Sequence, residues 1–250
     1  MAAKTSAVAD WAASRDPYKM IQQVPHRTGR GPNAYRLAAA GILRLVPDAI
    51  HAPPLFFNHI ADRLEMAAVF GPDEWRTLET WYRGSGVTFF PRELLHFFTS
   101  GSGQGSVLWF VRVRGQDSLG SLVLQLQHMI DDFWGNTAGG TFSFDKNYEF
   151  DVGAAAVLRE VFGSPVKRRP GRVDRPYRWP PREVPVGWRT DTVLALAGRI
   201  WELRDFAAMP ILADALQDAG CDRADILDHC RDPNAAHSRG CWVLDAVLSP

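Results

Sequence analysis

The sequence predicts a mainly α-helical fold in three parts, and three observations lead to this prediction. Apolar residues recur at helical spacing along most of the chain. Prolines and glycines fall at the ends of these stretches, where helices start and stop. The remaining prolines gather in one segment, residues 164–188. We therefore expect a multi-helix N-terminal and central region over 1–163, a linker over 164–188, and a small C-terminal helical bundle over 189–250.

The N-terminal stretch contains several helix signals. Asp16 followed by Pro17 is typical of an N-cap and the first helical position. Asn33 is a second candidate N-cap, for a helix that Pro47 should end. A further helix is expected over 55–70, where large apolar residues recur at helical spacing.

The central stretch is harder to interpret. Residues 107–113 form a short apolar run that fits either a strand or a buried helix, so the region can hold a short β element. An apolar stripe predicts a helix over 118–134, and another helix is expected over 151–162. Between them, Phe142 and Phe144 alternate as in an edge strand.

The segment 164–188 contains six prolines and seven basic residues. Each proline fixes φ and removes a backbone donor, so we expect neither a helix nor a central strand there, but an extended linker. Beyond it, Thr190 or Asp191 should cap a helix, and further helices are expected over 207–219, from 222 or 223 to 231, and from 239 or 240 to 248.

Composition argues against several classes of protein. Acidic and basic residues balance at 28 each, which disfavours a dedicated nucleic-acid binder, although the basic linker could bind phosphate or an acidic partner. No apolar run approaches the roughly 18 residues that span a bilayer, and residues 1–6 lack the apolar core of a signal peptide. We expect a cytoplasmic protein without a membrane segment.

Five residues near the C-terminus could bind a metal. Zinc takes cysteine and histidine ligands, and these residues fall within 21 positions: Cys221, His229, Cys230, His237 and Cys241. The spacing lacks a C-x₂-C pair, and adjacent residues on a helix diverge by about 100°, so His229 and Cys230 should not both be ligands. We expect the cysteines to fill the core of the bundle, with no metal or other cofactor and with a zinc site as the alternative.

The expected helix over 118–134 carries a candidate group for acid–base chemistry. His128, Asp131 and Asp132 fall at positions i, i+3 and i+4, which suits a histidine–carboxylate pair. Such pairs are common on helix surfaces, and the chain has no known catalytic signature. The sequence therefore favours a protein that is not an enzyme and has no catalytic residue.

Three segments resemble one family of uncharacterised planctomycete proteins. They are MPILADALQDAGCDRADILDHCRDPNAAHSRGCWVLDAVL over 209–248, the pattern W-x-x-S-x-D-P-x-x-M that begins at Trp11, and VLREVFGSP over 157–165. The resemblance covers about half of the chain and implies an all-helical fold. It implies no activity, ligand or catalytic residue.

A shorter resemblance lies in the central stretch. Residues 81–97, with GVTFFPRELLHF at 86–97, are similar to the entry segment of SMI1/KNR4-type immunity and interaction domains. This resemblance implies a mixed sheet over 107–150 and a protein partner.

Nine tryptophans and fourteen phenylalanines add to this picture, because tryptophan is enriched at interaction hot spots. We therefore expect a non-enzymatic interaction or scaffold protein with a protein partner. The alternatives are a zinc module or enzyme built on the C-terminal cysteines and histidines, and an immunity-like protein.

Overall fold

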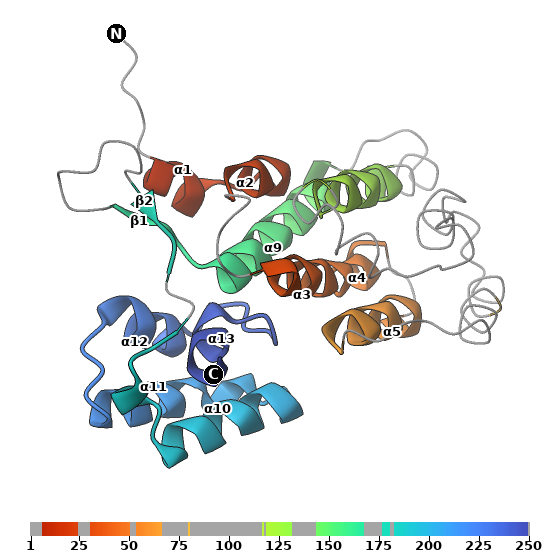
Figure 1. The fold of residues 1–250 in the computed structure, drawn as a ribbon. Coiled ribbons are helices and arrows are strands. Elements are labelled where there is room, and N and C mark those ends of the chain that lie inside the picture. The colour runs from red at the N-terminus through yellow and green to blue at the C-terminus, as the bar shows by residue number, and fades with distance from the viewer. Residues whose placement is uncertain are drawn as a thin grey trace, which may run out of the picture. The chain divides into compact units, whose positions relative to one another are not determined.

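The computed structural model confirms the mainly α-helical fold (Figure 1). It describes residues 7–24, 31–50, 54–66, 80, 117, 119–131, 144–167, 177–180 and 183–249. The chain forms two compact units. We call residues 15–27 and 31–155 the central unit, and residues 1–14, 28–30 and 156–250 the terminal unit.

The central unit begins with α2 (Pro17–Gln23), whose start was predicted correctly. The Asp16 side chain accepts a hydrogen bond of 2.9 Å from the backbone N–H of Lys19, as an N-cap does. Asn33 is not a cap, because α3 (Gly31–Leu43) already begins two residues earlier. Pro47 does not end that helix either. It lies in the first turn of α4 (Val46–Ile50), where a missing N–H costs no hydrogen bond.

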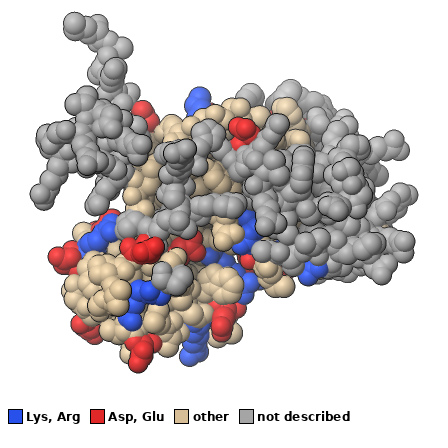
Figure 2. Space-filling view, viewed as in Figure 1, with Lys and Arg blue, Asp and Glu red and all other residues tan. Residues whose placement is uncertain are grey.

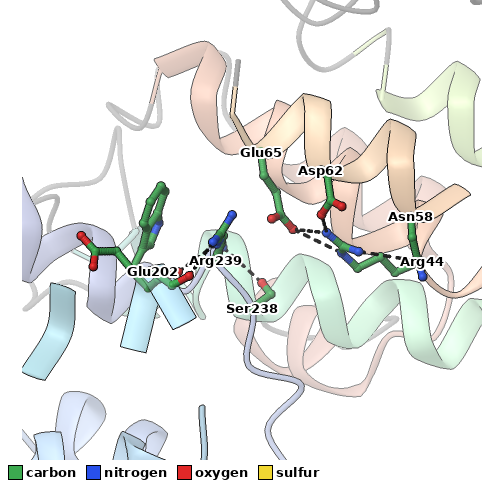
Figure 3. Close-up of polar contacts among 9 residues, drawn as sticks. Arg44, Asn58, Asp62, Glu65, Glu202, Ser238 and Arg239 are labelled. Carbon is green, nitrogen blue, oxygen red and sulfur yellow. Dashed lines mark hydrogen bonds and ion pairs between the residues drawn. The ribbon is translucent and has the colours of Figure 1, made fainter. Parts of the chain in front are cut away.

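The helix α5 (Pro54–Glu65) packs against α3, and Arg44 supports this packing (Figure 3). Its guanidinium contacts Asp62 at 2.6 Å and Glu65 at 3.0 Å. Glu65 is buried, so its charge is paired in a place where an unpaired carboxylate would be costly.

The predicted helix over 118–134 is present over the described residues 119–131. The edge strand at Phe142 and Phe144 was wrong at Phe144, where the long helix α9 (Phe144–Phe162) begins. Two alternating aromatics are too few to set a strand, and the residues that follow have the helical period. Within α9, a Cβ on Gly153 would lie 3.0 Å from the Leu45 side chain, so the glycine permits close packing.

The terminal unit contains α1 (Ala7–Ala13) and the last turns of α9. Gly163 ends α9 with φ +69°, and a Cβ there would lie 2.5 Å from the Pro180 ring. The segment 164–188 is not wholly extended. Its ends form a short antiparallel pair, β1 (Val166–Lys167) with β2 (Tyr177–Arg178), and a 3₁₀ turn, η1 (Val186–Trp188). The prolines of this segment permit such a pair because each strand has only two residues, and neither of them is a proline that would lack an N–H donor.

Four C-terminal helices follow, near the predicted positions: α10 (Asp191–Leu203), α11 (Met209–Asp218), α12 (Ala224–Arg231) and α13 (Trp242–Leu248). Thr190 caps α10 by accepting the N–H of Val193 at 3.3 Å. A 3₁₀ turn, η2 (Phe206–Ala208), precedes α11. The core between these helices is continuous and includes all three cysteines, which are free thiols.

Among the described residues, no helix has the length and apolar character that crossing a bilayer requires. Acidic and basic side chains alternate over the face of the C-terminal helices seen in Figure 2. The segment 107–113 lies outside the described residues, so its strand or helix character stays a prediction.

Candidate metal centre

Four side chains of the terminal unit converge on one point: Glu160, His229, His237 and Cys241. Glu160 comes from the last turn of α9, and His229 from the last turn of α12. His237 lies in the irregular segment 232–241, and Cys241 immediately precedes α13. One potential ligand atom from each of the four lies within 4.8 Å of the other three.

Three of the separations within the cluster are short enough for ligands of one ion. His229 Nε2 lies 3.3 Å from Glu160 Oε2 and 3.3 Å from Cys241 Sγ. His237 Nδ1 lies 3.1 Å from Glu160 Oε1. Zinc bonds of about 2.0–2.1 Å to N and O and about 2.3 Å to S give tetrahedral edges of about 3.3–3.6 Å. These three contacts fall at or just below that range. The two histidines contact different oxygens of Glu160, and the ligand atoms spread over 4.8 Å, so the side chains would have to draw together around an ion.

His229 Nε2 faces a carboxylate oxygen and a sulfur at the same distance. It carries at most one hydrogen and can donate it to either atom, while the Cys241 thiol can itself donate a hydrogen bond. A metal ion would accept the lone pair of this nitrogen together with the lone pairs of the oxygen and sulfur. The two imidazole rings are close to perpendicular, with centroids 5.1 Å apart.

All four side chains are largely shielded from solvent. Glu160 and His237 have side-chain exposures of 2% and 9%, His229 has 16%, and Cys241 is fully buried. A carboxylate in such a place needs positive partners or a cation.

The electrostatics of Glu160 reflect its histidine neighbours. Burial by itself raises the pKa of the carboxyl, but the hydrogen bonds and charges of His229 and His237 outweigh burial and lower the pKa to about 2. Glu160 is therefore an anion at neutral pH, which is the form that binds a metal. Burial and the nearby Glu160 charge raise the pKa of the Cys241 thiol well above its usual value, so an ion would have to displace its proton.

Backbone contacts hold the segment that carries His237 and Cys241. Arg239 donates from Nε to the carbonyl of Trp201 at 2.8 Å and from a terminal nitrogen to that of Glu202 at 2.7 Å (Figure 3). Its guanidinium also lies 4.7 Å from the centroid of the Trp201 ring. The Ser238 carbonyl accepts the N–H of Cys241 at 2.9 Å. These bonds anchor the segment at the C-terminal end of α10.

Three of the five candidates from the sequence thus belong to the cluster, and two do not. Cys221 and Cys230 are buried core residues outside it. The expected divergence of His229 and Cys230 is confirmed, since only His229 points to the cluster. The expected burial of the cysteines is also confirmed, but Cys241 is a potential ligand as well as a core residue.

Glu160 was missed from the sequence. It follows Val157 by three residues on α9, which places a charged side chain on the apolar face of the helix. Charged residues are seldom fully buried without a partner, so a glutamate on the apolar face of this helix indicates a buried partner or ion.

The structure describes only part of the other candidate sites. His128 is exposed on the helix over 119–131, and Asp132 lies outside the described residues, as do 86–97 and most of the basic linker. Those interpretations stay predictions.

In comparisons with known proteins, no family model, no curated protein and no solved structure matched the chain. The two family resemblances therefore stay predictions. The mixed sheet over 107–150 that the SMI1/KNR4 resemblance implies is wrong for the described residues 119–131 and 144–150, which are helical because their apolar residues recur at helical spacing.

Proposed function

We propose that this chain binds one zinc ion through Glu160, His229, His237 and Cys241, and that the ion stabilises the terminal unit. The observation that supports this proposal is the convergence of the four ligand atoms. The sequence favoured a scaffold protein without a metal, with zinc as the alternative, and the geometry favours the alternative.

The donor atoms indicate the class of ion. Two imidazole nitrogens, a thiolate and a carboxylate suit a first-row transition metal, whereas Mg²⁺ and Ca²⁺ prefer oxygen donors alone. With Glu160 and Cys241 ionised and both imidazoles neutral, a dication leaves the buried cluster without net charge. Zinc accepts this donor set tetrahedrally and is redox-inert.

A stabilising role follows from where the ligands lie in the chain. Glu160 is 77 positions from His237, and the segment 232–241 lacks helical hydrogen bonds along most of its length. An ion here would join the end of α9 to α12 and to the start of α13. Four protein ligands with little exposure are typical of a structural site.

Elemental analysis of the purified full chain tests the proposal, with two buried cysteines as a matched pair. We expect one zinc per chain in the wild type, retention in Cys230→Ala, and loss in Cys241→Ala, because only Cys241 has its sulfur in the cluster. A Glu160→Gln variant should bind zinc more weakly, since the amide is neutral. Zinc that survives Cys241→Ala, or a wild type that binds none from a zinc-containing buffer, would refute the proposal.

The interaction role expected from the aromatic content stays a separate prediction. None of the described tryptophans is exposed, and Trp11 and Trp242 are core residues. Trp11 and Trp242 therefore serve packing, while Trp179, Trp188 and Trp201 are half-buried.

A further inference from the structure

A pocket of about 370 Å³ in the terminal unit reaches two of the four cluster residues. Glu160 and His229 line it, together with Trp242 and Pro180. Its size is within the range of small-molecule sites. Cys241 does not line it, so the pocket approaches the cluster from the carboxylate and imidazole side.

The charged side chains that line the pocket differ in how many hydrogen bonds and ion pairs they form within the protein. Arg159 donates to the backbone carbonyls of Trp11 and Ser14. Asp225 is paired with Arg223 through both of its oxygens. Among the described residues, the Asp232 side chain accepts only the backbone N–H of Asn234, at 2.9 Å, and forms no ion pair.

The pocket therefore offers two complementary features to a small ligand. One is the ion, which Glu160 and His229 would hold at the pocket wall; an oxygen donor would reach it as a fifth ligand, a coordination number that zinc adopts at catalytic sites. The other is the carboxylate of Asp232, which is exposed and would attract a cation. A ligand with an anionic oxygen at one end and an ammonium group at the other would satisfy both.

We propose that this pocket binds a small zwitterion, whose carboxylate coordinates the metal ion and whose ammonium group pairs with the Asp232 carboxylate. This inference rests on the proposed zinc site. It assigns that site a ligand class, small amino acids.

Cobalt-loaded full-length protein provides the test, because the visible spectrum of Co²⁺ reports its coordination. β-Alanine and propionate form a matched pair of probes that differ in the ammonium group. We expect β-alanine to change the spectrum saturably and to bind about two- to fivefold more tightly than propionate, which is the range of an exposed ion pair. Asp232→Asn should abolish this difference, and Asp228→Asn, an exposed carboxylate of α12 outside the pocket, should retain it.

The outcomes separate this inference from the zinc site. A cobalt spectrum that neither probe changes would show a closed site, which overturns the inference and leaves the metal site intact. Equal affinities for the two probes, or a preference that survives Asp232→Asn, would overturn the ligand class. Absence of any protein-bound cobalt spectrum would refute the metal site and the inference with it.

Discussion

Arg239 lies two residues after His237 and two before Cys241, between two potential ligands of the ion. Its hydrogen bonds to the carbonyls of Trp201 and Glu202 hold the backbone segment that contains His237 and Cys241. Groups that orient metal ligands commonly affect affinity by about 10–100-fold.

We therefore expect Arg239→Lys to lower zinc affinity about tenfold, since lysine keeps the charge but cannot reproduce the planar fork on two carbonyls. Competition with a chromophoric chelator measures the affinity. Arg44→Lys is the matched control, because Arg44 contacts Asp62 and Glu65 in the central unit, which contains none of the four ligands. An unchanged affinity in Arg239→Lys, or an equal loss in Arg44→Lys, would show that Arg239 does not position the ligands.

Three of the four potential ligands could be predicted from the sequence, and Glu160 could not. His229, His237 and Cys241 were candidates because their side chains are ordinary zinc ligands close together in sequence. Glu160 was not, because carboxylates are frequent on helices and only the fold brings this one to the histidines. Conversely, Cys221 and Cys230 have ligand chemistry but are directed into the core.

Among the helices, α2 has the cap that can be tested most simply. The Asp16 side chain accepts the N–H of Lys19 at 2.9 Å and also contacts the Lys19 ammonium group. We expect Asp16→Ala to reduce the free energy of unfolding by about 1 kcal/mol, and Asp16→Asn by less, because asparagine is also a good N-cap. Chemical denaturation measures both, and equal losses in the two variants would contradict the capping role.

The same cap should depend on pH. Burial by itself raises the pKa of Asp16, but hydrogen bonds and the Lys19 charge outweigh it, so the pKa in the folded state is lower than the usual 3.8. A lowered pKa stabilises the fold above the unfolded-state value, and this contribution disappears as pH falls through the folded-state value. The advantage of wild type over Asp16→Asn should therefore shrink below about pH 4.

Helices were predicted best where local signals agreed. In the C-terminal region, a capping threonine, Pro210 in the first turn of α11 and Gly220 after it all mark ends that the structure has. The errors arose where one residue was given too much weight. Asn33 is an interior residue of α3, and Phe144 starts a helix although it alternates with Phe142.

For the whole molecule, the proposed ion connects segments that are far apart in sequence. Binding to the folded state alone stabilises it by about 2.7 kcal/mol when free zinc is at 100 times its Kd. That stabilisation should concentrate in the terminal unit, which contains all four ligands.

Hydrogen exchange measured with and without a chelator tests this distribution. We expect removal of zinc to accelerate exchange in α12, α13 and the segment between them, because their attachment to Glu160 is lost. The helices α3 and α5 of the central unit serve as the internal reference and should change least. Equal acceleration in both units, or none in α12 and α13, would contradict a local stabilising role.

The fold class could be predicted from the sequence because it depends on local periodicity, which most of the chain displays. The metal cluster could not be completed in the same way, because Glu160 and His237 meet only through tertiary structure, across 77 positions.

X-ray absorption at the zinc edge, on protein purified without added chelator, tests the four-residue zinc site most directly. We expect a shell of one sulfur at about 2.3 Å and three nitrogen or oxygen atoms at about 2.0–2.1 Å, from one cysteine, two histidines and one glutamate. A shell without sulfur, or with two or more sulfurs, would contradict the site formed by Glu160, His229, His237 and Cys241.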